Sequence, residues 1–287
     1  MSRGERTRWS IVQEASAFKA GNVHPLIGFD NMDFARFVAA AEAIGDAIDR
    51  STALSLGQLV VQCTRAMLDV TGVNTSLGTI LLLAPLIQYE IQCEQTSDEC
   101  LRSQMLRPEW TGNSIQQWLQ ATSFEDSSQI YRAIASCKPG GMGSSQSMDI
   151  LGPPPDSILK AMRLAAEHDD VALQYCNGYL EVARYARYLV SPEYRAMSLA
   201  DAIRRLQLVI LAERVDSLIA RKCGLTVGRE VQSRAGILMR STYGSALFEA
   251  EWKAFDEFLR SDGNRRNPGT TADLIATALY VASDVWM

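Results

Sequence analysis

Four short polar stretches carry the residue types that could bind a ligand or do chemistry. The first, residues 71–78, reads Thr-Gly-Val-Asn-Thr-Ser-Leu-Gly and separates an amphipathic pattern from a nearly unbroken apolar run. If the long-reach polar side chains of Asn74 and Thr75 are buried, they must be hydrogen-bonded. Gly78 would let a ligand approach the backbone closely. The stretch predicts either a ligand contact or a helix stop at Gly72 with an N-cap at Asn74 or Thr75.

The second stretch is Lys19-Ala-Gly-Asn-Val-His24, which follows an N-terminal helical pattern containing Glu14. Gly21 and Asn22 suit a helix exit. A lone histidine beside a proline is more often structural than catalytic. Its ordinary pKa near 6.5 would nevertheless suit a general base, so both interpretations of His24 stay open.

The third group of candidates is acidic. Asp30 or Asn31 would cap a helix that starts near Asp33, or these side chains would offer oxygen ligands to a hard cation. Asp216 lies within the pattern 211–222, where a continuous helix would surround it with apolar side chains. A carboxylate there must be paired, either with an arginine from another helix or with a metal ion.

The fourth stretch is Asn267-Pro-Gly-Thr-Thr-Ala-Asp273. Thr270 and Asp273 have the spacing of a capping box. The same free N–H groups, glycine and hydroxyls at a helix start would bind phosphate. Because Asp273 repels phosphate unless a divalent ion lies between them, a functional site here predicts a Mg²⁺–phosphate ligand.

Composition excludes several classes of protein. The 287 residues are 47% hydrophobic and carry a net charge of −5, without a basic block of the kind that binds nucleic acid. With only two histidines, the sequence argues against a multi-histidine zinc site. Its six cysteines form no Cys-x-x-Cys pair, which predicts reduced thiols in a cytoplasmic protein. The apolar run 79–91 is too short to span a membrane. A homo-oligomer is compatible with such apolar helices.

The hydrophobic period is helical almost throughout, which predicts an all-α fold with one large domain of about a dozen helices over residues 1–287. After the N-terminal helix, the expected helices cover residues 32–49, 55–70, 78–92, 113–121, 125–136, 156–168, 170–189, 198–222, 226–240, 244–261 and about 271–285. Pro192 is expected to open a turn. Residues 138–155 form the one long irregular loop, a length that is often functional.

Taken together and in their order along the chain, these stretches resemble the triphosphoribosyl-dephospho-CoA synthase family, whose members are all-helical. The family pattern runs Lys-Pro-Gly-x-Val-Asp, Asp-Met, Gly-Val-Asn-Thr-His-Lys-Gly, Asp-Thr-Asn with Arg-Gly-Gly, and Ser-Pro-Gly-Gly-Ser-Ala-Asp-Leu. The matching residues are Lys19, Gly21, Val23, Met32, Phe37, Gly72, Val73, Asn74, Thr75, Gly78, Asp216, Arg221, Gly224, Pro268, Gly269, Ala272, Asp273 and Leu274.

The resemblance implies transfer of the triphosphoribosyl group of ATP to a hydroxyl of dephospho-CoA, with release of adenine and with Mg²⁺ as cofactor. It implies that Asp216 and Asp273, with Asp33, hold Mg²⁺ or stabilise an oxocarbenium ion. The other implied roles are phosphate contacts from Lys19, Arg221 and Arg266, ribose or base contacts from Asn74 and Thr75, a closing loop at 140–143, and His24 as general base. Further substrate contacts are expected from Gly21, Asn22, Gly78, Asn267, Gly269, Thr270 and Thr271.

Departures from the family pattern leave the substrate open. His24 and Asn31 replace aspartates, Ser76-Leu77 replaces His-Lys, and Ser217-Leu218 replaces Thr-Asn. One alternative is therefore a divergent enzyme with another donor or acceptor, in the biosynthesis of a tetrahydromethanopterin-type one-carbon carrier. A second alternative is a helical interaction protein without catalytic activity.

Overall fold

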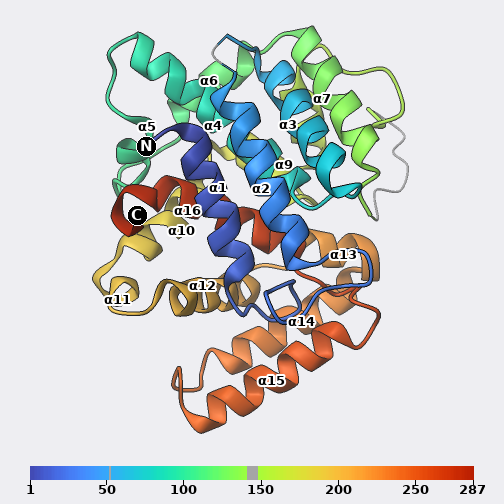
Figure 1. Ribbon diagram of the computed structural model, residues 1–287, viewed down its shortest axis with the longest axis vertical. Coiled ribbons are helices and arrows are strands. Elements are labelled where there is room, and N and C mark those ends of the chain that lie inside the picture. Colours follow the sequence, from blue (N-terminus) through green and yellow to red (C-terminus); the bar gives the residue numbers. More distant parts are fainter. Residues whose placement is uncertain (52, 141–147) are drawn as a thin grey trace.

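The computed structural model describes residues 1–51, 53–140 and 148–287. These ranges contain sixteen helices and no β-sheet, which confirms the predicted all-α class (Figure 1). The predicted closing loop 140–143 lies outside the described residues except for Gly140. The helices are α1 (Arg3–Ser16), α2 (Phe34–Asp49), α3 (Leu56–Thr71), α4 (Leu77–Gln95), α5 (Leu101–Met105), α6 (Asn113–Gln120), α7 (Phe124–Cys137), α8 (Ile158–Ala165), α9 (Asp170–Asn177), α10 (Leu180–Val190), α11 (Pro192–Arg195), α12 (Leu199–Glu213), α13 (Ser217–Cys223), α14 (Leu225–Leu238), α15 (Ala246–Arg260) and α16 (Gly269–Trp286).

The last helix, α16, is the centre of the main hydrophobic core. It packs against α1, α4, α10 and α12, and Figure 1 shows it crossing the middle of the molecule. Leu274, Ile275 and Leu279 are almost completely buried in this core. Helices α1, α2, α3 and α7 pack side by side in that order. Because α16 is buried nearly all round, its N-terminus is held firmly inside the molecule.

A second, smaller hydrophobic core lies among helices α12, α13, α14 and α15. Its members include Leu211, Ile219, Val231 and Phe248, and Figure 1 shows α14 and α15 as a pair at one end of the molecule. Ala20, in the loop after α1, belongs to this second core. That loop therefore lies where the two cores meet.

Two predicted helices are wrong because each is interrupted. The expected helix 170–189 ends at Gly178, whose φ of 70° is the left-handed conformation that glycine favours at a helix end. Its backbone there crosses that of Gly112 so closely that a Cβ at position 178 would lie 2.4 Å from the Gly112 carbonyl oxygen. The expected helix 198–222 divides into α12 and α13, with Asp216 as the N-cap of α13.

Several smaller expectations have clear outcomes. Gly72 ends α3 in the left-handed conformation and Pro192 opens α11, as predicted. Asp33, rather than Asp30 or Asn31, caps α2, and the short helix α5 was not predicted. All six cysteines are free thiols. None of the described helices is both long and apolar enough to cross a membrane.

Candidate functional site

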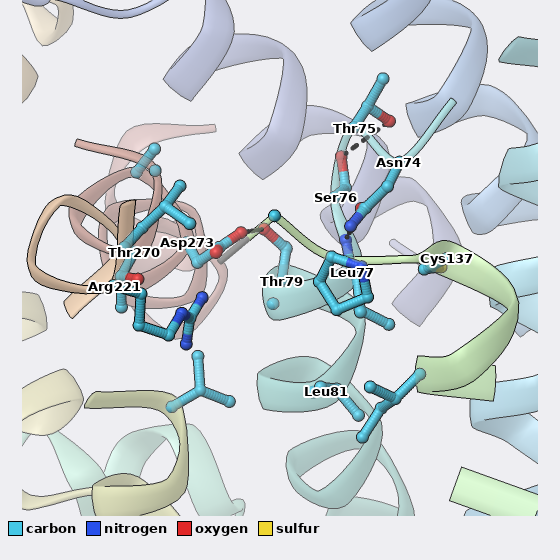
Figure 2. Close-up of a pocket in the computed structure, with 18 of the residues that line it drawn as sticks. Asn74, Thr75, Ser76, Leu77, Thr79, Leu81, Cys137, Arg221, Thr270 and Asp273 are labelled. Atoms are coloured by element: carbon cyan, nitrogen blue, oxygen red, sulfur yellow. Dashed lines mark hydrogen bonds between the residues drawn. The ribbon is translucent and has the colours of Figure 1, made fainter. Parts of the chain in front are cut away.

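A cavity of about 970 Å³ opens where helix ends and loops from all parts of the chain converge (Figure 2). This volume is at the upper end of the range of small-molecule sites. Its walls come from the end of α1, the loops 22–32 and 72–76, the starts of α2 and α4, the end of α7, helices α8 and α13, the turn 263–269 and the start of α16. The cavity brings together parts of all four polar stretches.

One acid of the cavity wall is Asp273, which is half-buried in the second turn of α16. Its Oδ1 accepts a 2.6 Å hydrogen bond from the hydroxyl of Thr79 on α4, and Figure 2 shows these two side chains pointing toward each other. Its Oδ2 lies against Gly78, where an added Cβ would be only 2.1 Å away. The predicted capping box is therefore wrong, because Asp273 bonds across to α4 and Thr270 forms no cap; the N-cap position of α16 is Pro268.

Burial raises the pKa of Asp273 from an ordinary value of 3.8 to about 7. The hydrogen bond from Thr79 opposes this shift, whereas the nearby carboxylate of Glu14 adds to it. Glu14 also lines the cavity, and burial raises its pKa although Lys19 lies 3.0 Å from its carboxylate. Two interacting acids thus share one side of the cavity, which favours a proton or a cation between them.

This raised pKa predicts how stability depends on pH in the absence of ligand. Between pH 3.8 and about 7 the unfolded chain has ionised Asp273 and the native protein keeps it protonated, so the free energy of unfolding should fall as pH rises through this window. Urea unfolding at pH 5 and pH 7.5 measures the difference. We expect wild type to lose more stability than Asp273→Asn; equal losses would contradict the assignment.

Asp216 lies at the junction of α13 and α16, and only 2% of its surface is exposed. Its Oδ1 accepts the backbone N–H groups of Leu218 and Ile219, and its Oδ2 accepts both the N–H and the hydroxyl of Thr271 at 2.8 Å. Asp216 therefore caps two helices at once. It is not among the described residues that line the cavity, and neither the predicted continuous helix around it nor the alternative of an arginine ion pair is found.

A basic wall, formed by Arg221, Lys222 and Arg265, faces the cavity. Arg221 pairs with Asp169 at the start of α9, and Lys222 donates a 2.9 Å hydrogen bond to Asn267. Burial lowers the pKa of Lys222, and neighbouring arginines lower it further. Cations held this close together favour an anionic ligand.

The loop before α4 contributes the Asn74 and Thr75 side chains to the cavity wall. Asn74 accepts the N–H of Leu77 at 3.0 Å, and the hydroxyl of Ser76 donates to Thr75 at 3.3 Å (Figure 2). Asn74 thus bonds to the start of α4, but the predicted N-cap at Asn74 or Thr75 is wrong, because the N-cap position is Ser76. Leu77, at a position where the family pattern has a lysine, also lines the cavity.

Other predicted residues divide between the cavity wall and its surroundings. Asn22, Asn267, Gly269 and Thr270 line the cavity, whereas Lys19, Gly21, His24, Asp33, Arg266 and Thr271 are not among its lining residues.

Three of these outlying residues have other partners. His24 accepts the N–H of Leu26 through Nδ1, and burial lowers its pKa, which favours the neutral form. Arg266 stacks on Phe258 and donates to its carbonyl oxygen. Lys19 is buried against Glu14.

Sequence reasoning missed several polar residues of the site, among them Glu14 as a wall carboxylate, Thr79, Lys222 and Arg265. Thr79 directly follows Gly78 and begins the apolar run, where the sequence predicts only core residues. Lys222 follows the predicted Arg221 directly, which is the one signal that could have found it. Nothing in the sequence places Arg265 beside α13.

Comparison with known proteins gives a family match over almost the whole chain. The sequence profile of the ATP:dephospho-CoA triphosphoribosyl transferase family matches residues 2–284. A crystal structure described as a candidate triphosphoribosyl-dephospho-CoA synthase from Archaeoglobus fulgidus has the same fold, with a TM-score of 0.59. At 21% identity, the similarity covers 87% of this chain and 97% of that one. Among proteins with curated descriptions, none matches this chain.

Proposed function

The chain belongs to the ATP:dephospho-CoA triphosphoribosyl transferase family, and on that premise we propose that the cavity beside Asp273 is where ATP and dephospho-CoA react. In this reaction the N9–C1′ bond of ATP breaks and a bond from C1′ to an acceptor hydroxyl oxygen forms. Adenine leaves with the electron pair and a proton, and the triphosphate stays on the transferred ribose. The observation that carries the proposal is one cavity with a half-buried acid, Asp273, and a basic wall.

The acid side of the cavity suits the ribose. Cleavage of the glycosidic bond gives C1′ oxocarbenium character, and a carboxylate placed near it stabilises that charge. Asp273 is held by the hydroxyl of Thr79 and lies against Gly78, where the absence of a side chain leaves room for its Oδ2. A carboxylate fixed in this way needs no reorganisation as positive charge develops on the ribose.

The basic wall suits the triphosphate. Arg221 and Lys222 project from one helix, and Arg265 reaches that helix by donating to the Lys222 carbonyl oxygen at 2.6 Å. Guanidinium and ammonium groups form charge-assisted hydrogen bonds with phosphate oxygens. We place the triphosphate along this wall, which leaves the ribose near α16.

The residues present fit a magnesium ion, although the described residues contain no group of three or more metal-ligating side chains. Magnesium in nucleotide enzymes uses one or two carboxylates, and substrate phosphates and water complete its coordination. The carboxylate of Asp273 would hold the ion, whose charge would favour the ionised form of that acid. When bound, Mg²⁺ would neutralise phosphate charge.

Replacing a lysine of the basic wall should weaken nucleotide binding. Because a hydrogen bond to a charged group contributes about 1.5–3 kcal/mol, Lys222→Met should raise the Kd for Mg-ATP about 10- to 100-fold. Isothermal titration calorimetry measures this change. Lys253→Met is the matched control, because Lys253 is exposed on α15. Equal Kd values for both variants would exclude the proposed triphosphate position.

The acceptor has a second candidate, because Leu77 and Leu218 line the cavity at positions where the family pattern has polar residues. A less polar wall would favour an acceptor other than dephospho-CoA, such as a pterin of the tetrahydromethanopterin type. Both acceptors are tested by supplying each in turn with ATP and measuring the release of adenine by chromatography. Release with dephospho-CoA alone supports the family reaction; release with the pterin alone supports the alternative. No release with either would overturn both.

A further inference from the structure

A glutamine outside the cavity holds the loop that carries Asn22. Gln207, in the middle of α12, is completely buried. Its Oε1 accepts the backbone N–H of Ala20 at 2.9 Å, and its Nε2 donates to the Ala20 carbonyl oxygen at 2.9 Å. The same Nε2 donates to Oδ1 of Asn22, also at 2.9 Å. All three bonds join α12 to the loop after α1.

These bonds fix which way the Asn22 amide points. A backbone N–H can only donate and a backbone carbonyl can only accept, so the orientation of the Gln207 amide is set by Ala20. An amide nitrogen has two hydrogens, and Gln207 uses one for the Ala20 carbonyl and the other for Asn22. The atom of Asn22 that faces Gln207 must therefore be its oxygen, although shape alone does not distinguish the two ends of an amide.

The nitrogen of Asn22 must then face away from α12. It makes one long hydrogen bond, 3.4 Å, to the Pro268 carbonyl oxygen at the start of α16. Asn22 lines the cavity, and its second amide hydrogen has no other partner among the residues that the structure describes. The amide nitrogen of Asn22 thus offers the cavity a donor, whereas the acids Glu14 and Asp273 of the same cavity can only accept when ionised.

We propose that Gln207 is a positioning residue, which orients Asn22 so that its amide N–H donates to an acceptor oxygen of a nucleoside triphosphate in the cavity. This inference rests on the proposed function for the identity of the ligand. Gln207 itself is not among the residues that line the cavity, so it acts through Asn22. A glutamine at this position matters because glutamate or methionine could not donate to both the Ala20 carbonyl and Asn22.

A double-mutant cycle separates positioning from general structural support. The variants are Asn22→Ala, Gln207→Met and their combination, and the measurement is the Kd for Mg-ATP by calorimetry. Because a neutral hydrogen bond contributes about 0.5–1.5 kcal/mol, each single variant should weaken binding about 2- to 10-fold. The double variant should bind as weakly as Asn22→Ala and no weaker. Gln207→Met should still lower the Tm in the Asn22→Ala background, because the Ala20 bonds are lost there too.

Other outcomes would overturn the proposal. If the two effects on Kd multiply, or if Gln207→Met leaves Kd unchanged, Gln207 does not act through Asn22. Should Gln207→Met fail to fold, Gln207→Glu, which keeps the size of the side chain, takes its place in the same cycle.

The orientation can also be measured without ligand. By ¹⁵N-resolved hydrogen exchange of side-chain amides, both Gln207 protons should exchange slowly and the Asn22 protons faster. The reverse order would overturn the inferred orientation. Wild type that fails to bind Mg-ATP but shows the expected exchange order would instead count against the proposed function alone.

Discussion

Asp273→Asn is expected to reduce the rate of triphosphoribosyl transfer about a hundredfold or more, the size of effect seen when one preorganised electrostatic group is removed from an active site. Asparagine keeps the shape and can still accept the hydrogen bond from Thr79, but it carries no charge to stabilise the ribose or to hold Mg²⁺. A single-turnover rate with saturating substrates measures the effect. The Tm should change little or rise, because a buried acid is removed.

Two further variants make this test specific. Gly78→Ala leaves the carboxylate charge in place but puts a Cβ 2.1 Å from its Oδ2, so Asp273 must shift and activity should fall to an intermediate level. Asp156→Asn is the matched control, because Asp156 is exposed and forms an ion pair with the neighbouring Lys160 on α8. If Asp273→Asn were as active as the Asp156 control, Asp273 could not have the role that we propose.

Asp216→Ala should lower the free energy of unfolding by about 3 kcal/mol, since it removes two helix caps of about 1 kcal/mol each and leaves buried donors unsatisfied. Denaturant titration measures the loss. Asp216→Asn should cost less, because its Oδ1 can still accept the N–H groups of Leu218 and Ile219, while its amide faces the Thr271 donors.

The same two variants decide between the capping role and the role predicted from the sequence. A metal ligand or catalytic acid at position 216 would lose activity in Asp216→Asn with little change in stability. If Asp216 is a double cap, Asp216→Asn lowers the free energy of unfolding, and the folded fraction of the variant keeps most of its activity. Loss of activity at unchanged stability would therefore show that Asp216 has a catalytic or metal-binding role.

The helical class and the order of the four polar stretches could be predicted because periodicity and cap signals are local. Gly178 was also a readable signal, since glycine after asparagine commonly ends a helix. The break between α12 and α13 could not be predicted in the same way. No glycine or proline marks residues 199–223, and the break is fixed by Asp216 bonding to Thr271, which is 55 residues away in the chain.

The site itself depends on contacts that the sequence does not display. Apart from the place of Lys222 directly after Arg221, nothing distinguishes Arg265 and Lys222 among 28 basic residues until the turn 263–269 is placed against α13. Arg266, the phosphate contact implied by the resemblance, lies over the Phe258 ring. Gln207 looks like any polar residue on a helix, and only burial against Ala20 shows that its amide has fixed partners.

The central claim is that an intact triphosphoribosyl group moves from ATP to dephospho-CoA. The most direct test supplies ATP labelled with ¹³C throughout its ribose and ¹⁸O in its γ-phosphate, with Mg²⁺ and unlabelled dephospho-CoA, and analyses the products by mass spectrometry. We predict that both labels appear together on dephospho-CoA, with one adenine released for each product formed. Adenine without labelled product, or labelled ribose without the γ-phosphate label, would contradict the account.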